Sequence, residues 1–281
     1  MNKITDLFSN PAPALAIAVT SGKGGVGKTS VAVNLGVALR RMKRSVMLLD
    51  ADLGLANIDV LLGLNPRYNL SHVIRGECTL DEVVIDGPEG LLIVPAGSGI
   101  QEMAELSSNE HAGLINAFNE LKRDIDTLIV DTAAGINKSV LNFCQAANEV
   151  LVVVNDEPSS LTDSYGLIKV LAQDYGVKRF HVLTNRVDNS ADGFLLYQRL
   201  LNTTDQFLNV EIKYLGAIPQ DKYVRQANQQ QKLLLKCFPQ STAAHAFKDV
   251  AKRVSQWYSP ETAGGGMEFF LERLINQSTA A

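Results

Sequence analysis

Seven short, continuously apolar runs recur along the chain, with longer segments of helical spacing between them. The runs are Leu15–Thr20, Ser45–Leu49, Leu91–Val94, Thr127–Val130, Val150–Val154, Phe180–Thr184 and Tyr214–Ile218. Runs without polar alternation are typical of strands covered on both faces, as in parallel sheets. Strands that alternate with helices predict an α/β fold, built as a doubly wound, mostly parallel sheet flanked by helices.

Apolar residues at helical spacing indicate where the helices lie. We expect helices over Lys28–Arg41, His111–Arg123, Ser160–Tyr175, Gly193–Phe207 and Ser241–Trp257. Proline and three consecutive glycines then break the pattern before a short amphipathic helix over Met267–Ile275. The chain is therefore expected to have an N-terminal extension (1–13), a main domain (14–258), a glycine-rich linker (259–266) and a C-terminal amphipathic segment (267–281).

Composition restricts the class of protein. Hydrophobic residues make up 46% and charged residues 20% of the 281 residues, which is globular composition. The net charge of −4 argues against a protein that coats nucleic acid. The three cysteines lie far apart without a CxxC pair, and no apolar run reaches the ~20 residues that span a bilayer. With no secretory signal pattern, we expect a cytoplasmic protein.

The strongest chemical signal is the glycine-rich segment after the first apolar run. Gly22–Thr29 reads GKGGVGKT, which fits G-x-x-x-x-G-K-[ST] between a predicted strand and a predicted helix. Glycines let backbone N–H groups surround phosphate oxygens, and the helix N-terminus adds positive charge. The predicted nucleotide-binding residues of the loop are Gly24, Gly25, Val26, Gly27, Lys28, Thr29 and Ser30. Lys28 is predicted to contact the β- and γ-phosphates, and Thr29 to bind Mg²⁺.

Three aspartates end apolar runs and are the candidate acids of the site. Asp50 and Asp52 follow the second run, and Asp131 closes LIVD. In parallel sheets such positions lie at the carboxyl edge, where ligands bind. Asp131 has the Walker B arrangement, which holds Mg²⁺. A single strand-end aspartate is more often a loop cap, but three of them beside a complete phosphate loop favour function.

A second lysine inside the loop, Lys23, gives the signature K-G-G-V-G-K-T of the deviant Walker A group. With this signature the sequence resembles the MinD/ParA family of dimerising ATPases. The resemblance implies a MinD-like P-loop NTPase fold, ATP and Mg²⁺ as ligands, and an ATP-sandwich homodimer. It implies that Lys23 reaches the partner's phosphates, that Asp52 positions the attacking water and that Asp50 belongs to the magnesium shell. The alternative for Lys23 is a solvated loop lysine.

The same resemblance assigns the adenine end of the site. Asn185 matches the asparagine that holds adenine in the family, and Pro219 and Asp221 in IPQD match the loop that wraps the ring. Asn185 has a structural alternative. For Asp221 the alternative is a helix N-cap, because aspartate before a helix is a good capping residue.

Four stretches resemble the flagellar-number-regulator (FlhG/FleN) branch of the family: DADLGLAN at Asp50–Asn57, VDTAAGI at Val130–Ile136, DEPSSLTD at Asp156–Asp163 and EFFLERL at Glu268–Leu274. That branch implies an ATPase that restrains polar flagellum number. Its implied partners are a sigma-54-dependent flagellar activator, the flagellar GTPase FlhF and C-ring components, with a peripheral position at the inner membrane or cell pole. The first ten residues, MNKITDLFSN, lack the DQA motif with which many members stimulate the GTPase.

Other functions remain open on the residues alone. A chromosome- or plasmid-partition ATPase needs a basic surface, and the net charge of −4 offers none, so direct DNA binding is not expected. A cell-division-site ATPase, a metabolic ligase on the same fold and a nucleotide-binding switch with negligible turnover are further alternatives. The last of these denies Asp52 a catalytic role.

The C-terminal segment Met267–Ile275 has three interpretations. It docks on the protein or a partner, it contacts a membrane, or it is a frayed tail. Membrane-binding helices are usually rich in lysine or arginine, whereas this one sets two glutamates against Arg273. We expect it to occupy a groove in one nucleotide state and to be released in the other.

Overall fold

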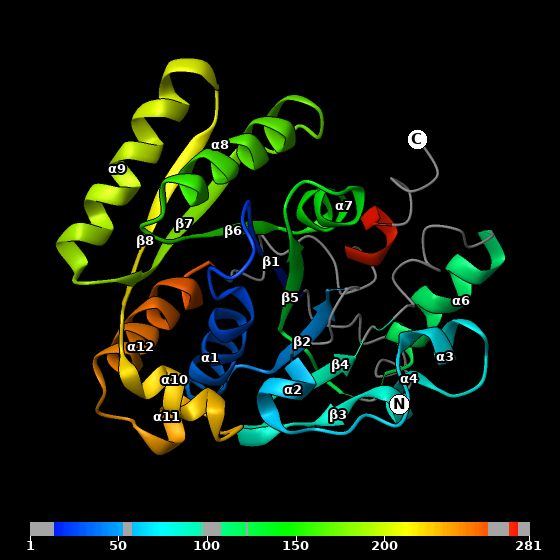
Figure 1. Cartoon of the computed structure of the whole chain (residues 1–281). Coiled ribbons are helices and arrows are strands. Elements are labelled where there is room, and N and C mark those ends of the chain that lie inside the picture. The colour runs from blue at the N-terminus through cyan, green and yellow to red at the C-terminus, as the bar shows by residue number, and fades with distance from the viewer. Residues whose placement is uncertain are drawn as a thin grey trace, which may run out of the picture.

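The structure is a computed structural model of the chain, and it describes residues 14–52, 58–95, 97, 108–121, 123–257 and 270–274. These residues form one eight-stranded sheet with helices on both faces (Figure 1). The strand order is β3-β4-β2-β5-β1-β6-β7-β8. All neighbouring pairs are parallel except β3 with β4. The predicted α/β class is therefore confirmed.

The strands are β1 (Leu15–Ser21), β2 (Val46–Ala51), β3 (Ile85–Asp86), β4 (Leu92–Pro95), β5 (Thr127–Ala134), β6 (Glu149–Val154), β7 (Arg179–Val187) and β8 (Glu211–Pro219). Seven of them coincide with the apolar runs. The eighth, β3, has only two residues and carries no periodicity from which it could be predicted.

The main helices are α1 (Lys28–Arg41), α6 (Ser108–Asn119), α7 (Lys138–Ala146), α8 (Pro158–Gln173), α9 (Ser190–Phe207), α10 (Lys222–Gln229) and α12 (Thr242–Ser255). Four shorter helices are α2 (Ile58–Leu62), α3 (Leu70–Ile74), α4 (Leu80–Val83) and α11 (Leu234–Cys237), with a 3₁₀ turn η1 at Pro88–Gly90. Residues 270–274 form one more helical segment, drawn in red in Figure 1.

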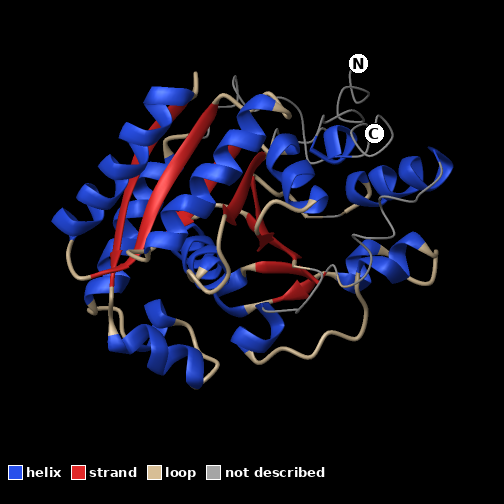
Figure 2. Ribbon diagram, turned by 45° about the horizontal axis from the view of Figure 1, so that its top comes forward, coloured by secondary structure: helices blue, strands red, loops and turns tan. Residues whose placement is uncertain are grey.

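The sheet is buried on both faces, which Figure 2 shows as helices on either side of the strands. In β1, Ala16 and Ala18 pack into one hydrophobic cluster, while Leu15 and Ile17 pack into the other. Successive strand residues point to opposite faces, so a strand between two helical layers must be apolar throughout. This is the physical reason that the strands read as continuous apolar runs.

The sheet topology places the glycine-rich loop at a switch point. In the sheet, β2 and β4 lie on one side of β1, whereas β6, β7 and β8, which come later in the sequence, lie on the other side. The crevice outside the carboxyl end of such a strand is where ligands bind in open α/β sheets. The loop between β1 and α1 lies at that end.

The C-terminal helical segment packs on the protein itself. Phe270, Leu271 and Leu274 are each at most 5% exposed and belong to a hydrophobic core cluster. The ring of Phe270 stacks on Phe143 of α7 with 6.3 Å between centroids. Of the three interpretations of this segment, docking on the protein's own core is the one found. The extension 1–13, the linker 259–266 and residues 267–269 and 275–281 lie outside the described residues.

Candidate functional site

Two glycines fix the path of the loop between β1 and α1. Gly27 caps α1 with φ of 97°, and a Cβ on it would lie 2.5 Å from Nδ2 of Asn185. A Cβ on Gly22 would lie 2.1 Å from the carbonyl carbon of Asp163 in α8. Neither position accepts a side chain, because Gly27 has a left-handed backbone and other segments approach both glycines closely.

The end of β7 holds the loop from one side. Asn185 donates from Nδ2 to the carbonyl of Val26 (2.7 Å), and Arg186 donates from Nη1 to the carbonyl of Gly25 (2.9 Å). Arg186 adopts a left-handed backbone with φ of 57°. The predicted Asn185 therefore lies against the phosphate loop, and Arg186 is a site residue that the sequence interpretation missed. Its only sequence signal is its place next to Asn185.

Lys28, the loop lysine, lies inside the site at 8% exposure. Burial lowers the pKa of its ammonium, while the carboxylates of Asp131 and Asp52 act in the opposite direction. The predicted acids therefore converge on this lysine. Asp50 and Asp131 are also direct neighbours, because they are paired in the register of β2 and β5.

Asp131 is a buried carboxyl group that lacks a well-formed hydrogen bond to any described residue. Its pKa is raised to about 7, first by burial and then by Asp50 and Asp52, while the nearby Thr29 hydroxyl and Lys28 lower it. A bound divalent cation would relieve this desolvated charge. Mg²⁺ in nucleotide sites takes one or two carboxylates together with phosphate oxygens. Asp131, Asp50 and Thr29 fit that donor set.

Asp50 also organises the segment after β2. Its Oδ1 accepts a hydrogen bond from the backbone N–H of Asp52 (3.3 Å), and its Oδ2 accepts one from the N–H of Ile58 (3.1 Å), which begins α2. The two bonds flank residues 53–57, which belong to the DADLGLAN stretch and lie outside the described residues. A single carboxylate thus links β2, Asp52 and α2.

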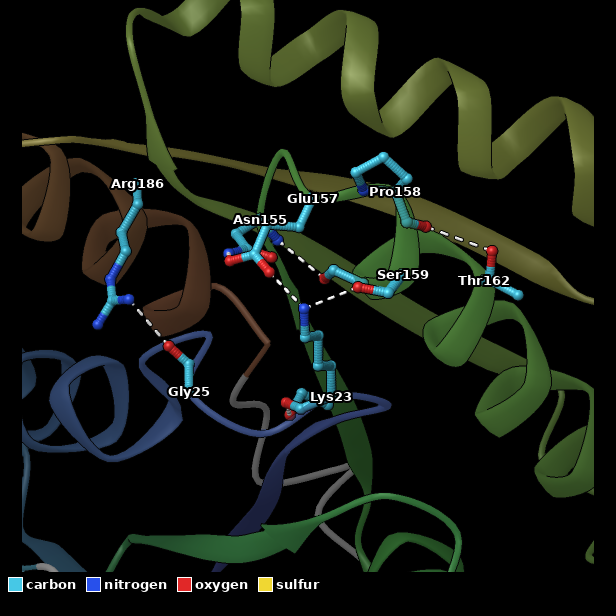
Figure 3. Close-up of polar contacts among 10 residues, drawn as sticks. Lys23, Gly25, Asn155, Glu157, Pro158, Ser159, Thr162 and Arg186 are labelled. Atoms are coloured by element: carbon cyan, nitrogen blue, oxygen red, sulfur yellow. Dashed lines mark hydrogen bonds and ion pairs between the residues drawn. The ribbon is translucent and has the colours of Figure 1, made fainter.

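Lys23 turns toward the N-terminal end of α8 (Figure 3). Its ammonium forms an ion pair with Glu157 and donates to the hydroxyl of Ser159 at 2.7 Å. The other oxygen of Glu157 accepts from Nδ2 of Asn155 at 2.6 Å. The hydrogen bonds from Lys23 and Asn155 hold the pKa of Glu157 below its usual range. Lys23 is therefore bound by the N-terminal end of α8 within its own chain.

A pocket of about 790 Å³ opens beside the loop. Its lining includes Gly27, Ser30, Asn185, Pro219 and Asp221, so it joins predicted phosphate-loop residues to the predicted adenine end. Segments far apart in the sequence meet here because β1, β7 and β8 end at the same edge of the parallel sheet.

Asp221 is fully engaged as a helix cap. Its Oδ1 accepts from the N–H of Tyr223 (2.9 Å), and its Oδ2 accepts from the hydroxyl of Thr242 (3.0 Å) and the N–H of Ala243 (3.1 Å). Burial alone would raise the pKa of Asp221, but these hydrogen bonds outweigh it and lower the pKa. The capping alternative is thus what the geometry shows, and a contact of Asp221 with nucleotide stays a prediction.

A phosphate loop with a second lysine, three converging aspartates and a doubly wound sheet define a P-loop nucleoside-triphosphatase of the deviant Walker A class. A family model described as the CobQ/CobB/MinD/ParA nucleotide binding domain matches residues 17–235. The chain therefore belongs to this family. It is an ATPase of the MinD/ParA type, with ATP as nucleotide and Mg²⁺ as metal.

Two relatives are similar over nearly their whole length. The antiactivator FleN of Pseudomonas aeruginosa is 53% identical over 263 residues, which cover 94% of each chain. The flagellum site-determining protein YlxH of Helicobacter pylori is 31% identical, over 95% of this chain and 92% of that protein. The name of the second protein refers to the flagellum.

Solved structures of MinD proteins share the fold. The septum site-determining protein MinD of Pyrococcus horikoshii, complexed with Mg-ADP, has a TM-score of 0.68 and 25% identity, covering 87% of this chain and 97% of that one. MinD in the MinC:MinD complex of Aquifex aeolicus has a TM-score of 0.66 and 28% identity, covering 86% and 96%. None of the helices in the described part of the chain combines the length and apolar character that crossing a membrane requires.

Proposed function

We propose that this protein is an Mg²⁺-dependent ATPase that dimerises with ATP and restrains polar flagellum number by antagonising a flagellar transcriptional activator. The observation that carries the flagellar role is the 53% identity to the antiactivator FleN over 94% of both chains. The observation that supports the dimer concerns Lys23. Its ammonium is bound by Glu157 and Ser159 and does not join Lys28 and the aspartates in the nucleotide site of the same chain.

In the proposed mechanism the loop amides and Lys28 bind the triphosphate. Thr29, Asp131 and Asp50 would hold Mg²⁺, whose charge would neutralise that of the phosphates. Asp52 orients a water molecule whose oxygen attacks the γ-phosphorus as the bond to the ADP oxygen breaks, giving ADP and phosphate. The protein contributes positioning and electrostatic stabilisation, which dominate phosphoryl transfer.

Lys23 supplies the step that requires a second copy. On dimerisation it leaves Glu157 and Ser159 and reaches the phosphates of the partner subunit. A cation that arrives only in the dimer stabilises charge on the leaving phosphates, as an arginine finger does. Hydrolysis is thereby coupled to dimer formation, and the ADP-bound chain returns to the monomer.

The flagellar branch supplies the proposed partners: a sigma-54-dependent activator, the GTPase FlhF and C-ring components. The proposed location is the cell pole or the inner membrane. A membrane contact through residues 267–275 would require Phe270 to leave its stacking partner Phe143. Such release is compatible with a segment attached through a glycine-rich linker.

The test is a flagellum count in a strain that lacks the gene and carries plasmid-borne variants. Loss of the gene should give several polar flagella and raised activator-dependent transcription, and the wild type should restore both. Lys28→Ala should fail to restore either, because it cannot hold the nucleotide. The matched variant Lys169→Ala, an exposed lysine of α8, should restore both. Unchanged flagellum number and unchanged transcription after gene loss would disprove the flagellar role.

A further inference from the structure

A second hollow is lined by residues of α2, η1, α11 and the segment that precedes α11. It has a volume of about 420 Å³ and is lined by Leu62, Pro88, Gln231, Lys232, Leu233, Lys236 and Cys237. None of these residues lines the nucleotide pocket. We call this hollow the α2–α11 groove. Its size is within the range of small binding sites.

The floor of the α2–α11 groove is apolar. Of its lining residues, Leu62 and Leu233 are almost fully buried, and Pro88 is a further apolar residue. The exposed Val60 adjoins it, because the carbonyl of Val60 accepts a hydrogen bond from Nε2 of Gln231 at 2.9 Å. Val60 is 65% exposed, the second most exposed large hydrophobic residue in the described chain after Phe207. The surface thus offers apolar area to a ligand.

The rim of the groove is positively charged. Lys232 and Lys236 are exposed, and no carboxylate in the described part of the chain pairs with either. Among the described residues that line the groove, none is acidic. Glu89, which follows Pro88, is already paired with Arg41 at 3.0 Å. This local excess of positive charge contrasts with the net charge of −4 of the whole chain.

The groove walls are connected to both ends of the nucleotide site. On one side α2 begins at Ile58, whose N–H donates to Asp50. On the other side Gln231 follows α10, the helix that Asp221 caps after the predicted adenine loop. A ligand that fits between α2 and α11 therefore contacts two segments that are linked to the site, one through Asp50 and the other through the helix that Asp221 caps.

We infer that the α2–α11 groove is a docking site for an acidic amphipathic segment of a partner protein. An apolar side chain of that segment fills the groove, and its carboxylates pair with Lys232 and Lys236. The apolar residues Leu62, Pro88 and Leu233 offer contact area that suits an apolar side chain and not a phosphate backbone, so the chemistry favours a protein over nucleic acid. The inference rests on the proposed function for its partner, which is the flagellar activator.

The experiment measures binding of the purified activator to the full chain with Mg-ATP. Lys232→Glu/Lys236→Glu should weaken binding at least ~10-fold, because reversed rim charges repel the segment. The control Lys169→Glu/Lys178→Glu makes the same charge change at exposed lysines elsewhere and should bind as the wild type does. Both variants should retain ATP affinity, which verifies folding.

Cys237 gives a second readout at the groove itself. It is the one exposed cysteine of the three, since Cys78 is half-buried and Cys144 buried. Bound activator should slow alkylation of Cys237 by iodoacetamide, as mass spectrometry would show. Cys237→Trp fills the groove without altering charge and should also weaken binding.

The outcomes separate the two proposals. Equal binding by the wild type and by Lys232→Glu/Lys236→Glu, or unprotected Cys237 in the complex, overturns the docking site and leaves the proposed function intact. A wild-type chain that does not bind the activator contradicts that part of the proposed function. In that case a twelve-residue peptide of glutamate and leucine tests the groove directly. If this peptide protects Cys237 from alkylation, and a peptide with lysine in place of glutamate does not, the docking site is supported. If the glutamate peptide gives no protection, the docking site is overturned.

Discussion

Lys23 and Lys28 lie in one loop and have opposite environments. Lys28 is buried among carboxylates, whereas Lys23 is partly exposed and paired with Glu157. The loop motif predicted phosphate contact for Lys28, whereas the role of Lys23 toward the partner's phosphates was implied by the family resemblance. The residue that holds Lys23 could not be predicted from spacing, because Glu157 is 134 positions away and meets it only through the order of β1 and β6 in the sheet.

The contact between Lys23 and Glu157 has a testable consequence. Glu157→Gln removes the charge that retains Lys23 and should tighten ATP-dependent dimerisation by up to about fivefold, the range expected for an exposed ion pair. Sedimentation velocity across a dilution series measures the dimer dissociation constant. Glu120→Gln, an exposed change elsewhere, serves as control. Weaker dimerisation in Glu157→Gln with unchanged ATP affinity would show that Glu157 supports the dimer instead of retaining Lys23.

Asp131 predicts a pH dependence of stability. Its folded-state pKa of about 7 exceeds the ordinary value of 3.8, so the nucleotide-free folded state keeps a proton that the unfolded state loses. The contribution of Asp131 to the free energy of unfolding therefore falls as pH rises from 4 to 7. Asp131→Asn should stabilise the nucleotide-free protein at pH 8 by as much as about 4 kcal/mol, and much less at pH 5.

Urea unfolding of the wild type and Asp131→Asn at both pH values measures this difference. The same variant should lose the Mg²⁺ dependence of nucleotide binding, because the amide does not supply an anionic ligand. A stability difference that is equal at pH 5 and pH 8 would contradict the environment described for Asp131.

At the level of elements, the buried strands and the long helices could be predicted from the sequence. The predicted helix Lys28–Arg41 coincides with α1, and Ser160–Tyr175 overlaps α8, which begins two residues earlier at Pro158. Helices of four or five residues, such as α2 and α11, are too short to show a period and were not predicted. The α2–α11 groove consequently had no sequence signal, although it lies between segments that flank the site.

The C-terminal helical segment makes an element-scale prediction. Phe270→Ala removes the ring that stacks on Phe143 and should cost about 3 kcal/mol of docking free energy, as for other buried phenylalanines. Residues 270–274 should then lose protection from hydrogen exchange. Turnover should also change, because α7 follows the end of β5 that carries Asp131.

Hydrogen exchange followed by mass spectrometry and steady-state ATPase assays check this prediction. Glu272→Ala, an exposed change on the same segment, should leave both readouts unaltered. If Phe270→Ala matched the wild type in protection and turnover, the segment would be a passive tail.

At the scale of the whole molecule, one sheet edge collects residues from the entire chain. Lys28 follows β1, Asp50 and Asp131 are paired on neighbouring strands, and Asn185 comes from β7. The sequence predicted this convergence because parallel strands end at a common edge. It could not predict that Asp221 would be engaged by α12, since that contact depends on how a later helix packs.

The central claim is that ATP converts the monomer into a dimer in which Lys23 acts on the partner's phosphates. Light scattering on Asp52→Ala tests this claim. The turnover of this variant should fall 10²–10⁴-fold, so that ATP is not consumed during the measurement. We predict a dimer with Mg-ATP and a monomer with Mg-ADP, and we predict that adding Lys23→Ala leaves ATP binding intact but abolishes the dimer. Equal dimer content in ATP and ADP, or a dimer that persists without Lys23, would contradict the account.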